Sequence, residues 1–189
     1  MSDHQDQASK IGAGTFWRLM GMRPVGAAVV TASHAGVPAG LLPLPTTHVC
    51  APPPTMLVCV GGSTSALTTI KAAGCFAINY LPAGANEIAE VFGGRRQLSG
   101  ADRFTVGQWT PMDGWGSPSP VLANAVLALA CRIDTVFECG DTEIIAAQIE
   151  HYALDQSALP LVAYRGSYHA MELPHSVEAN GSKNGGKAS

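Results

Sequence analysis

The chain has 189 residues, a formal net charge of −3, and a composition that is 47% hydrophobic and 13% charged. This length suits one sizeable domain, and the apolar content excludes disorder for the body of the chain. A slightly negative charge also argues against the basic surface that binding to nucleic acids requires. We therefore expect one globular domain with no nucleic-acid partner.

Cysteine usage and the absence of a long apolar run indicate where the protein works. Its five cysteines form no CxxC pair, which predicts reduced thiols rather than a disulfide framework or a zinc site. Residues 1–10 are polar, and no run approaches the length that spans a membrane. The sequence thus predicts a cytoplasmic protein that binds neither metal nor membrane.

The first part of the chain is expected to hold one helix and a hairpin. Residues 1–12 are polar and predict a disordered end. Apolar residues at helical spacing predict a helix over 15–22, which Pro24 ends. The β-branched run 25–31 predicts one buried strand, and a turn at 34–37 leads into the next strand.

Residues 38–60 form the stretch around which the rest of the chain is organised, and they predict a strand, a shaped loop and a second strand. Pro43 and Pro45 remove backbone donors, so the backbone at residues 46–48 is expected to be open to something other than its own sheet. A ligand is one interpretation, and a proline-rich sheet edge without a ligand is the other.

A glycine-serine turn follows and leads into a helix over 66–73 that ends at Gly74. Ser63, Thr64 and Ser65 lie at its start. Free backbone N–H groups and hydroxyls at a helix start suit a phosphate, whereas a serine there is also an ordinary helix cap. Both interpretations stay open at this stage.

The second half of the chain is predicted to consist mainly of strands. Asn79 lies in a strand over 75–81 and either pairs with a neighbouring loop or contacts a ligand. The run 95–104 is the only dense positive patch, either beside an anionic ligand or solvated. The other predicted elements are a helix over 86–92, strands over 121–133, 136–139 and 144–151, and a hairpin of 161–164 with 168–171.

These elements predict a mainly β protein with short helices, built as a β-barrel. The domain is expected to cover residues 13–172, followed by a disordered tail over 173–189. Several stretches, taken in order, resemble the flavin reductase family. They are residues 23–31, 36–40, 53–59, 63–65, 73–79, 101–104, 119–122, 131 and 164–169.

This resemblance implies the FMN-binding split-barrel fold of the reductase components of two-component flavin monooxygenases. It implies a homodimer that binds FMN or FAD, with NAD(P)H stacked over the flavin ring as the hydride donor. The flavin ring is then expected against Thr46, Thr47, His48 and Val49, and the flavin phosphate near Ser63, Thr64 and Ser65.

Further site candidates are less specific. Arg23 either faces the flavin phosphate or covers the barrel, and Asn79 is a possible flavin contact. His169 matches a terminal histidine of the family and either lies near the nicotinamide or is a structural strand histidine. His48 replaces a family serine and either bonds the ring, acts as an acid or base, or faces solvent. His169 and His48 are the catalytic candidates.

The chain also departs from the family pattern. Family members have polar residues where this chain has Leu42, Leu44 and Pro45, and a histidine in the late turn where it has Thr142. The expected function is an NAD(P)H-dependent flavin reductase that supplies reduced flavin to a partner monooxygenase. The alternative is a non-redox enzyme or an accessory protein whose pocket takes an apolar small molecule.

Overall fold

The computed structural model describes residues 11–43 and 46–171. The ends predicted to be disordered therefore lie outside the described residues, apart from residues 11 and 12. The helices are α1 (Ala13–Met20), α2 (Ser65–Ala73), α3 (Asn86–Phe92) and the 3-10 helix η1 (Gly100–Thr105). The strands are β1 (Val25–Gly26), β2 (Ala28–His34), β3 (Val37–Leu41), β4 (Thr46–Cys50), β5 (Thr55–Gly61), β6 (Cys75–Tyr80), β7 (Trp109–Pro111), β8 (Pro120–Leu122), β9 (Leu127–Cys139), β10 (Thr142–Leu154), β11 (Leu161–Tyr164) and β12 (Ser167–Ala170).

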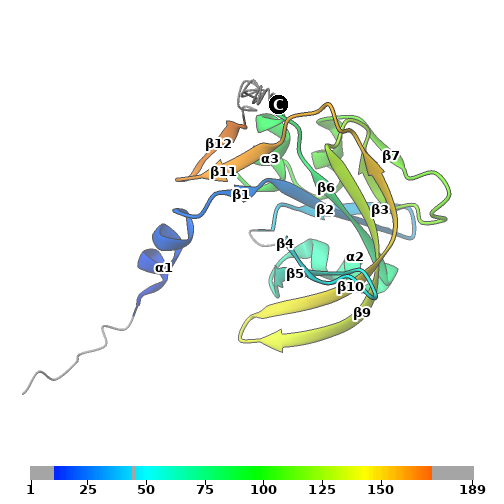
Figure 1. The fold of residues 1–189 in the computed structure, drawn as a ribbon. Helices are drawn as coiled ribbons and strands as arrows, with labels where there is room; N and C mark the ends of the chain where they lie inside the picture. Colours follow the sequence, from blue (N-terminus) through cyan, green and yellow to red (C-terminus); the bar gives the residue numbers. More distant parts are fainter. Residues whose placement is uncertain (1–10, 44–45, 172–189) are drawn as a thin grey trace, which may run out of the picture.

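The main sheet has seven strands in the order β3-β2-β6-β9-β10-β5-β4, and every neighbouring pair is antiparallel. β1, β11 and β12 form a three-stranded sheet, and β7 pairs with β8. The main sheet is strongly curled but stays open, with β3 and β4 as its edge strands (Figure 1). This is the predicted mainly β, split-barrel architecture.

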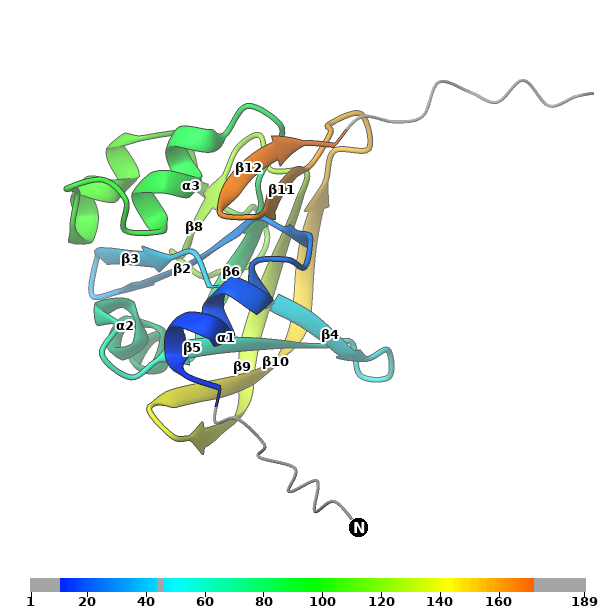
Figure 2. The same ribbon diagram turned by 90° about the vertical axis from the view of Figure 1, so that its left-hand side faces the viewer.

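The central strands are buried on both faces. On β2, Val29 packs in one hydrophobic cluster together with residues of α3, whereas Ala28 and Val30 pack in a second cluster with residues of α2. α2 and α3 therefore cover opposite faces of this part of the sheet (Figure 2). Burial on both sides explains why the sequence here is a continuous apolar run rather than an alternating pattern.

The predicted single strand over 25–31 is wrong, because the chain changes sheets at Ala27. The Ala27 N–H donates to the Leu161 carbonyl at 2.8 Å, and the Ala27 carbonyl accepts from the Leu81 N–H at 2.9 Å. β1 thus belongs to the small sheet and β2 to the main one. Apolar patterning continues across this junction and gives no sign of the change of partner.

The predicted strand over 121–133 is also wrong. β8 ends at Leu122, a turn follows in which the Ala125 N–H donates to the Leu122 carbonyl at 3.1 Å, and β9 begins only at Leu127. β9 then runs through the region predicted as a separate strand and forms a long hairpin with β10, with register shifts at Ala146/Ala147 and Ile149/His151. The turn between them is at the predicted place, where Gly140 has φ 63°.

α1 differs from the other helices because none of its residues is buried. It ends two residues earlier than predicted, where the Gly21 N–H donates to the Trp17 carbonyl at 2.9 Å. Phe16, Trp17 and Leu19 are exposed, and the helix protrudes on the same side as the tip of the β9–β10 hairpin (Figure 1). Nothing in the described fold explains this exposed apolar surface.

The structure also shows the state of the cysteines, the lengths of the described helices and the arrangement of possible metal ligands. All five cysteines lie in the described part of the chain and are free. Burial raises the pKa of the Cys131 thiol to about 12, so this thiol is an inert core side chain. Among the described residues, no helix is long and apolar enough to cross a bilayer. The same residues contain no group of three or more His, Cys, Asp or Glu side chains arranged to hold a metal.

Candidate functional site

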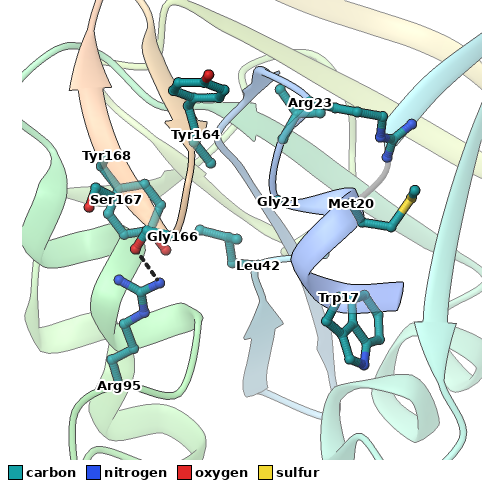
Figure 3. A pocket seen from close by; sticks show the side chains of 12 residues that line it. Trp17, Met20, Gly21, Arg23, Leu42, Arg95, Tyr164, Gly166, Ser167 and Tyr168 are labelled. Atoms are coloured by element: carbon teal, nitrogen blue, oxygen red, sulfur yellow. Dashed lines mark hydrogen bonds between the residues drawn. The ribbon is translucent and has the colours of Figure 1, made fainter. Parts of the chain in front are cut away.

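A pocket of about 320 Å³ lies between α1 and the β11–β12 hairpin (Figure 3). Its walls are mostly apolar, with Leu42 between the helix and the hairpin in this view. Leu42 is one of the residues at which the chain departs from the family pattern, and it does make the pocket more apolar. The lining residues are Trp17, Met20, Gly21, Arg23, Val25, Leu42, Arg95, Ala163, Tyr164, Gly166, Ser167 and Tyr168.

The hairpin wall of the pocket is fixed at its tip by two contacts. Arg95 Nη2 donates to the Gly166 carbonyl at 2.9 Å, and its guanidinium lies 5.2 Å from the centre of the Tyr168 ring. On the other side, the Arg165 N–H donates to the carbonyl of Gly21 at the end of α1, at 2.8 Å. These bonds join the hairpin both to α1 and to the loop after α3, so the pocket has a defined shape.

The pocket is positively charged. Its lining includes two arginines, Arg23 and Arg95, and no carboxylate. In Figure 3, Arg95 lies on the hairpin side and Arg23 extends toward the start of β4. Burial raises the pKa of the Tyr168 phenol, so this side chain is neutral at ordinary pH. Apolar walls that carry two arginines suit a ligand with both a ring and an anionic group.

β4 is only partly open, contrary to the sequence-based expectation for residues 46–48. Its residues pair with β5, with Thr46 opposite Val58 and His48 opposite Met56. β4 is the last strand of the sheet, however, so among the described residues its other edge is unpaired. Pro43 precedes the strand and does not interrupt it, and Leu44 and Pro45 lie outside the described residues.

The hydroxyl of Thr46 lies 3.1 Å from the phenol oxygen of Tyr80. Tyr80 belongs to β6, which three other strands separate from β4 in the sheet order. The two residues can meet only because the sheet curls, so this contact links its edge to the opposite wall of the barrel. Together they present two hydroxyl groups at the start of β4.

The start of α2 offers hydroxyls and some backbone N–H groups that have no partner among the described residues. Thr64 is the N-cap residue and makes no side-chain capping bond, so the interpretation of Ser65 as a plain helix cap is wrong. The preceding turn is held by the Gly62 N–H, which donates to the Asp141 carbonyl at 2.6 Å. A Cβ on Gly62 would lie 3.0 Å from that oxygen, so the close approach favours glycine. The Thr64 N–H donates to the Gly61 carbonyl at 2.9 Å, whereas the N–H groups of Ser63 and Ser65 and the hydroxyls of residues 63–65 have no partner among the described residues.

The three features lie on one side of the molecule. Figure 2 views this side directly, with α1 in front, α2 to its left, β4 to its right and the β11–β12 hairpin above. The pocket, the open edge of β4 and the start of α2 thus form one composite surface. It contains Thr46, Thr47, His48 and Val49 on β4 and Ser63, Thr64 and Ser65 at α2.

Asn79 does not belong to this surface, which corrects its place among the flavin-binding candidates. Its side chain is fully buried and its amide nitrogen donates to the Val29 carbonyl and the Thr31 hydroxyl, both at 3.1 Å. Its amide oxygen accepts from the Leu122 N–H at 2.9 Å. The amide thus joins β6 to β2 and β8, so its partners lie on strands rather than on the neighbouring loop of the other alternative.

The two histidine candidates lie on different strands. His48 is exposed on β4. His169 is exposed on β12, opposite Val162, with its ring 6.3 Å from that of Tyr164, and it does not line the pocket. Thr142, at the position of the family histidine, pairs with Gly61 beside the start of α2. The catalytic roles of His48 and His169 stay predictions.

Sequence reasoning missed several residues of this surface. Tyr80 and Trp17 carried no recognisable signal, because one is the last residue of a strand and the other a helix aromatic. Arg95 was visible only as part of a charged run, whose neighbours have other partners: Arg96 pairs with Glu90 at 2.8 Å, and Arg103 donates to the Gly40 carbonyl at 3.0 Å.

The family model described as Flavin reductase like domain matches residues 20–172. The chain belongs to this family. A relative from Ancylobacter novellus, named FMN reductase (NADH) RutF, is 34% identical over 153 residues, which cover 79% of this chain and 81% of that protein. The matched span of this flavin reductase-like chain contains the composite surface except for Trp17 on α1.

Solved structures agree with the family assignment. A structure of the Streptomyces globisporus C-1027 NADH:FAD oxidoreductase SgcE6, in complex with NAD and FAD fragments, superposes with a TM-score of 0.74 at 26% identity. It covers 88% of this chain and 94% of that one. The styrene monooxygenase flavin reductase from Pseudomonas putida S12, at 20% identity and a TM-score of 0.72, shares the fold of this flavin reductase-like chain over 85% of its length and 99% of the other chain.

Proposed function

We propose that this protein is an NAD(P)H-dependent flavin reductase that supplies reduced FMN or FAD to a separate monooxygenase. The observation that carries the proposal is family membership across residues 20–172, together with a composite surface that suits two phosphate-bearing ring systems. The same membership argues against the alternative of a flavin-free enzyme or accessory protein. A cytoplasmic setting is consistent with five free cysteines.

The residues present fit a flavin. The hydroxyls of residues 63–65 and the N–H groups of Ser63 and Ser65 suit a phosphate, because the helix start carries partial positive charge. The open edge of β4 presents alternating N–H and C=O groups, which match the amide-like donors and acceptors of a flavin ring. Thr46 and Tyr80 add two hydroxyls there, which offsets part of the polarity lost at Leu42.

A bound flavin supplies the redox chemistry, since its ring accepts a hydride from a nicotinamide. The residues of this chain then have to bind and orient two rings and exclude water from between them. Leu42, Trp17 and the tyrosines of the β11–β12 hairpin provide the apolar walls for that task. No strong acid or base is required, which agrees with exposed histidines that do not meet in the described structure.

We also propose that the protein is a homodimer, with α1 and the outer face of the β9–β10 hairpin at the interface. Phe16 and Trp17 on α1 and Phe137 on β9 are 43%, 57% and 54% exposed, and no described element covers them. α1 buries none of its residues within its own chain. A helix of this kind gains its stability from packing against a partner, because short isolated helices are marginal in water.

The activity is tested by titrating the purified protein with FMN and FAD, followed by NADH or NADPH under anaerobic conditions. The expected result is saturable flavin binding and bleaching of the flavin absorbance when the nicotinamide is added. A protein that neither binds a flavin nor accelerates NADH or NADPH oxidation in its presence would not be a flavin reductase.

A further inference from the structure

The pocket between α1 and the β11–β12 hairpin is separate from the other anion-binding feature of the surface. The proposed site for the flavin phosphate is the start of α2, which follows β5 and contributes no residue to the pocket lining. A reductase has a second phosphate-bearing reactant, the nicotinamide dinucleotide, which needs a cationic contact of its own.

Arg95 is suited to that contact. It lines the pocket, and one of its N–H groups donates to the Gly166 carbonyl at 2.9 Å while its plane is supported by the Tyr168 ring. A guanidinium has five donors, so most of its hydrogen-bonding capacity is unused among the described residues. Because its position is already fixed, little side-chain freedom is lost when it binds a phosphate.

The position of Arg95 within the pocket is equally informative. Arg23 extends toward the start of β4, whereas Arg95 lies on the hairpin side (Figure 3). A hydride donor must place its nicotinamide at the flavin, beside β4, and its phosphates farther away. The hairpin side is therefore where the phosphates would lie, between aromatic walls that suit a planar base.

We propose that the pocket binds the nicotinamide dinucleotide and that Arg95 recognises its phosphates, which makes Arg95 a specificity-determining residue for the hydride donor. This inference rests on the proposed function and adds to it the assignment of donor and flavin to different cationic groups. It also separates Arg95 from its neighbour Arg96, which is engaged with Glu90 at 2.8 Å and does not line the pocket.

The test compares Arg95→Gln with Arg96→Gln, a matched control that removes the same charge one residue away. Steady-state kinetics at saturating flavin use NADH and a phosphate-free donor, 1-benzyl-1,4-dihydronicotinamide. For Arg95→Gln we expect the KM for NADH to rise roughly tenfold, the loss expected for one charge-assisted hydrogen bond. The KM for the phosphate-free donor and the flavin Kd should stay within about twofold of wild type, as should all values for Arg96→Gln.

Calorimetric titration with ADP-ribose measures the same contact without any turnover. Wild type and Arg96→Gln should bind it, and Arg95→Gln should bind it roughly tenfold more weakly. If Arg95→Gln leaves both the NADH KM and the ADP-ribose affinity unchanged, if it raises the flavin Kd instead, or if wild type does not bind ADP-ribose, the assignment is wrong. Arg95-dependent ADP-ribose binding in a wild type that reduces no flavin would uphold the assignment and reject the proposed function.

Discussion

The hydroxyls of Tyr80 and Thr46 lie 3.1 Å apart, although three strands separate β6 from β4 in the order of the main sheet. This contact fixes the first residue of the strand against which the flavin ring is expected to lie. It also supplies hydroxyl groups at the start of β4, in a chain where Leu42 stands in place of a polar family residue.

We therefore expect Tyr80→Phe to weaken flavin binding about threefold to tenfold while changing the melting temperature by only a few degrees, because one partly exposed hydrogen bond contributes about 1 kcal/mol. The Kd is measured by quenching of flavin fluorescence. Tyr152→Phe is the control, since Tyr152 is 70% exposed on β10. Equal flavin affinity in the two variants would show that the hydroxyl pair plays no part in binding.

Phosphate binding at the start of α2 can be separated from ring binding. Ser63→Ala combined with Ser65→Ala should raise the Kd for FMN about tenfold, because two donors to the phosphate are lost. Riboflavin, which has no phosphate, should bind both proteins equally. Thr68→Ala, at an exposed position inside the same helix, should leave both affinities unchanged. A parallel loss of riboflavin affinity would place the serines at the ring instead.

Asn79 is predicted to act on stability rather than on binding. Asn79→Ala removes two donors and one acceptor from a fully buried network, so unfolding should become easier by about 2–4 kcal/mol. Urea denaturation measures this loss. In the fraction that remains folded, the flavin Kd should equal that of wild type. A variant with unchanged stability and impaired flavin binding would show that Asn79 contributes to the flavin site.

Stability should decrease in acid through Glu150. The hydrogen bond from Arg132 lowers the pKa of this carboxyl below its ordinary value of 4.5, and the Trp115 indole donates to it at 3.0 Å. A lowered folded-state pKa means that the contribution is complete above the ordinary value and is lost as the pH falls through the lowered one. The effect is modest, because the pair is largely exposed. As the pH is lowered through this range, the urea midpoint should fall less steeply for Glu150→Gln than for wild type. An identical pH dependence of the two midpoints would show that Glu150 does not contribute to the acid sensitivity.

The dimer proposal predicts that Phe137→Asp shifts the protein toward monomer, because a charge replaces an exposed aromatic on the proposed interface. Sedimentation velocity over a range of concentrations would detect the shift. Val37→Asp, at an equally exposed position on the edge strand β3, should leave the dimer intact. A wild type that sediments as a monomer at all concentrations would exclude the interface.

Local sequence signals predicted elements whose partners are close in the chain. The α3 helix has the predicted bounds, and the last hairpin turns at Arg165 and Gly166, where positive φ values of 51° and 76° allow the tight turn. The start of α2 was recognised because hydroxyl residues and glycines flank an apolar run.

The errors have a common physical origin in distant contacts. The change of sheets at Ala27 depends on Leu81 and Leu161, which lie far along the chain. The buried Asn79 amide accepts a hydrogen bond from Leu122, which is distant in the sequence. The contact of Arg95 with Gly166 likewise depends on how the β11–β12 hairpin packs. The resemblance to the family indicated that β4 and the start of α2 belong to the site. No local pattern could indicate that side chains from β6 and α1 lie beside them.

α1 has one further consequence. Trp17 and Met20 form a wall of the pocket, and Phe16 and Trp17 of the same helix belong to the apolar surface assigned to the second protomer. Occupancy of the pocket and self-association then depend on the same helix, and their free energies are coupled. By thermodynamic reciprocity, each ligand that orders α1 should tighten the dimer by the factor by which the dimer tightens the ligand. Dilution would therefore lower the apparent affinity for the hydride donor, although no residue that touches the donor has changed.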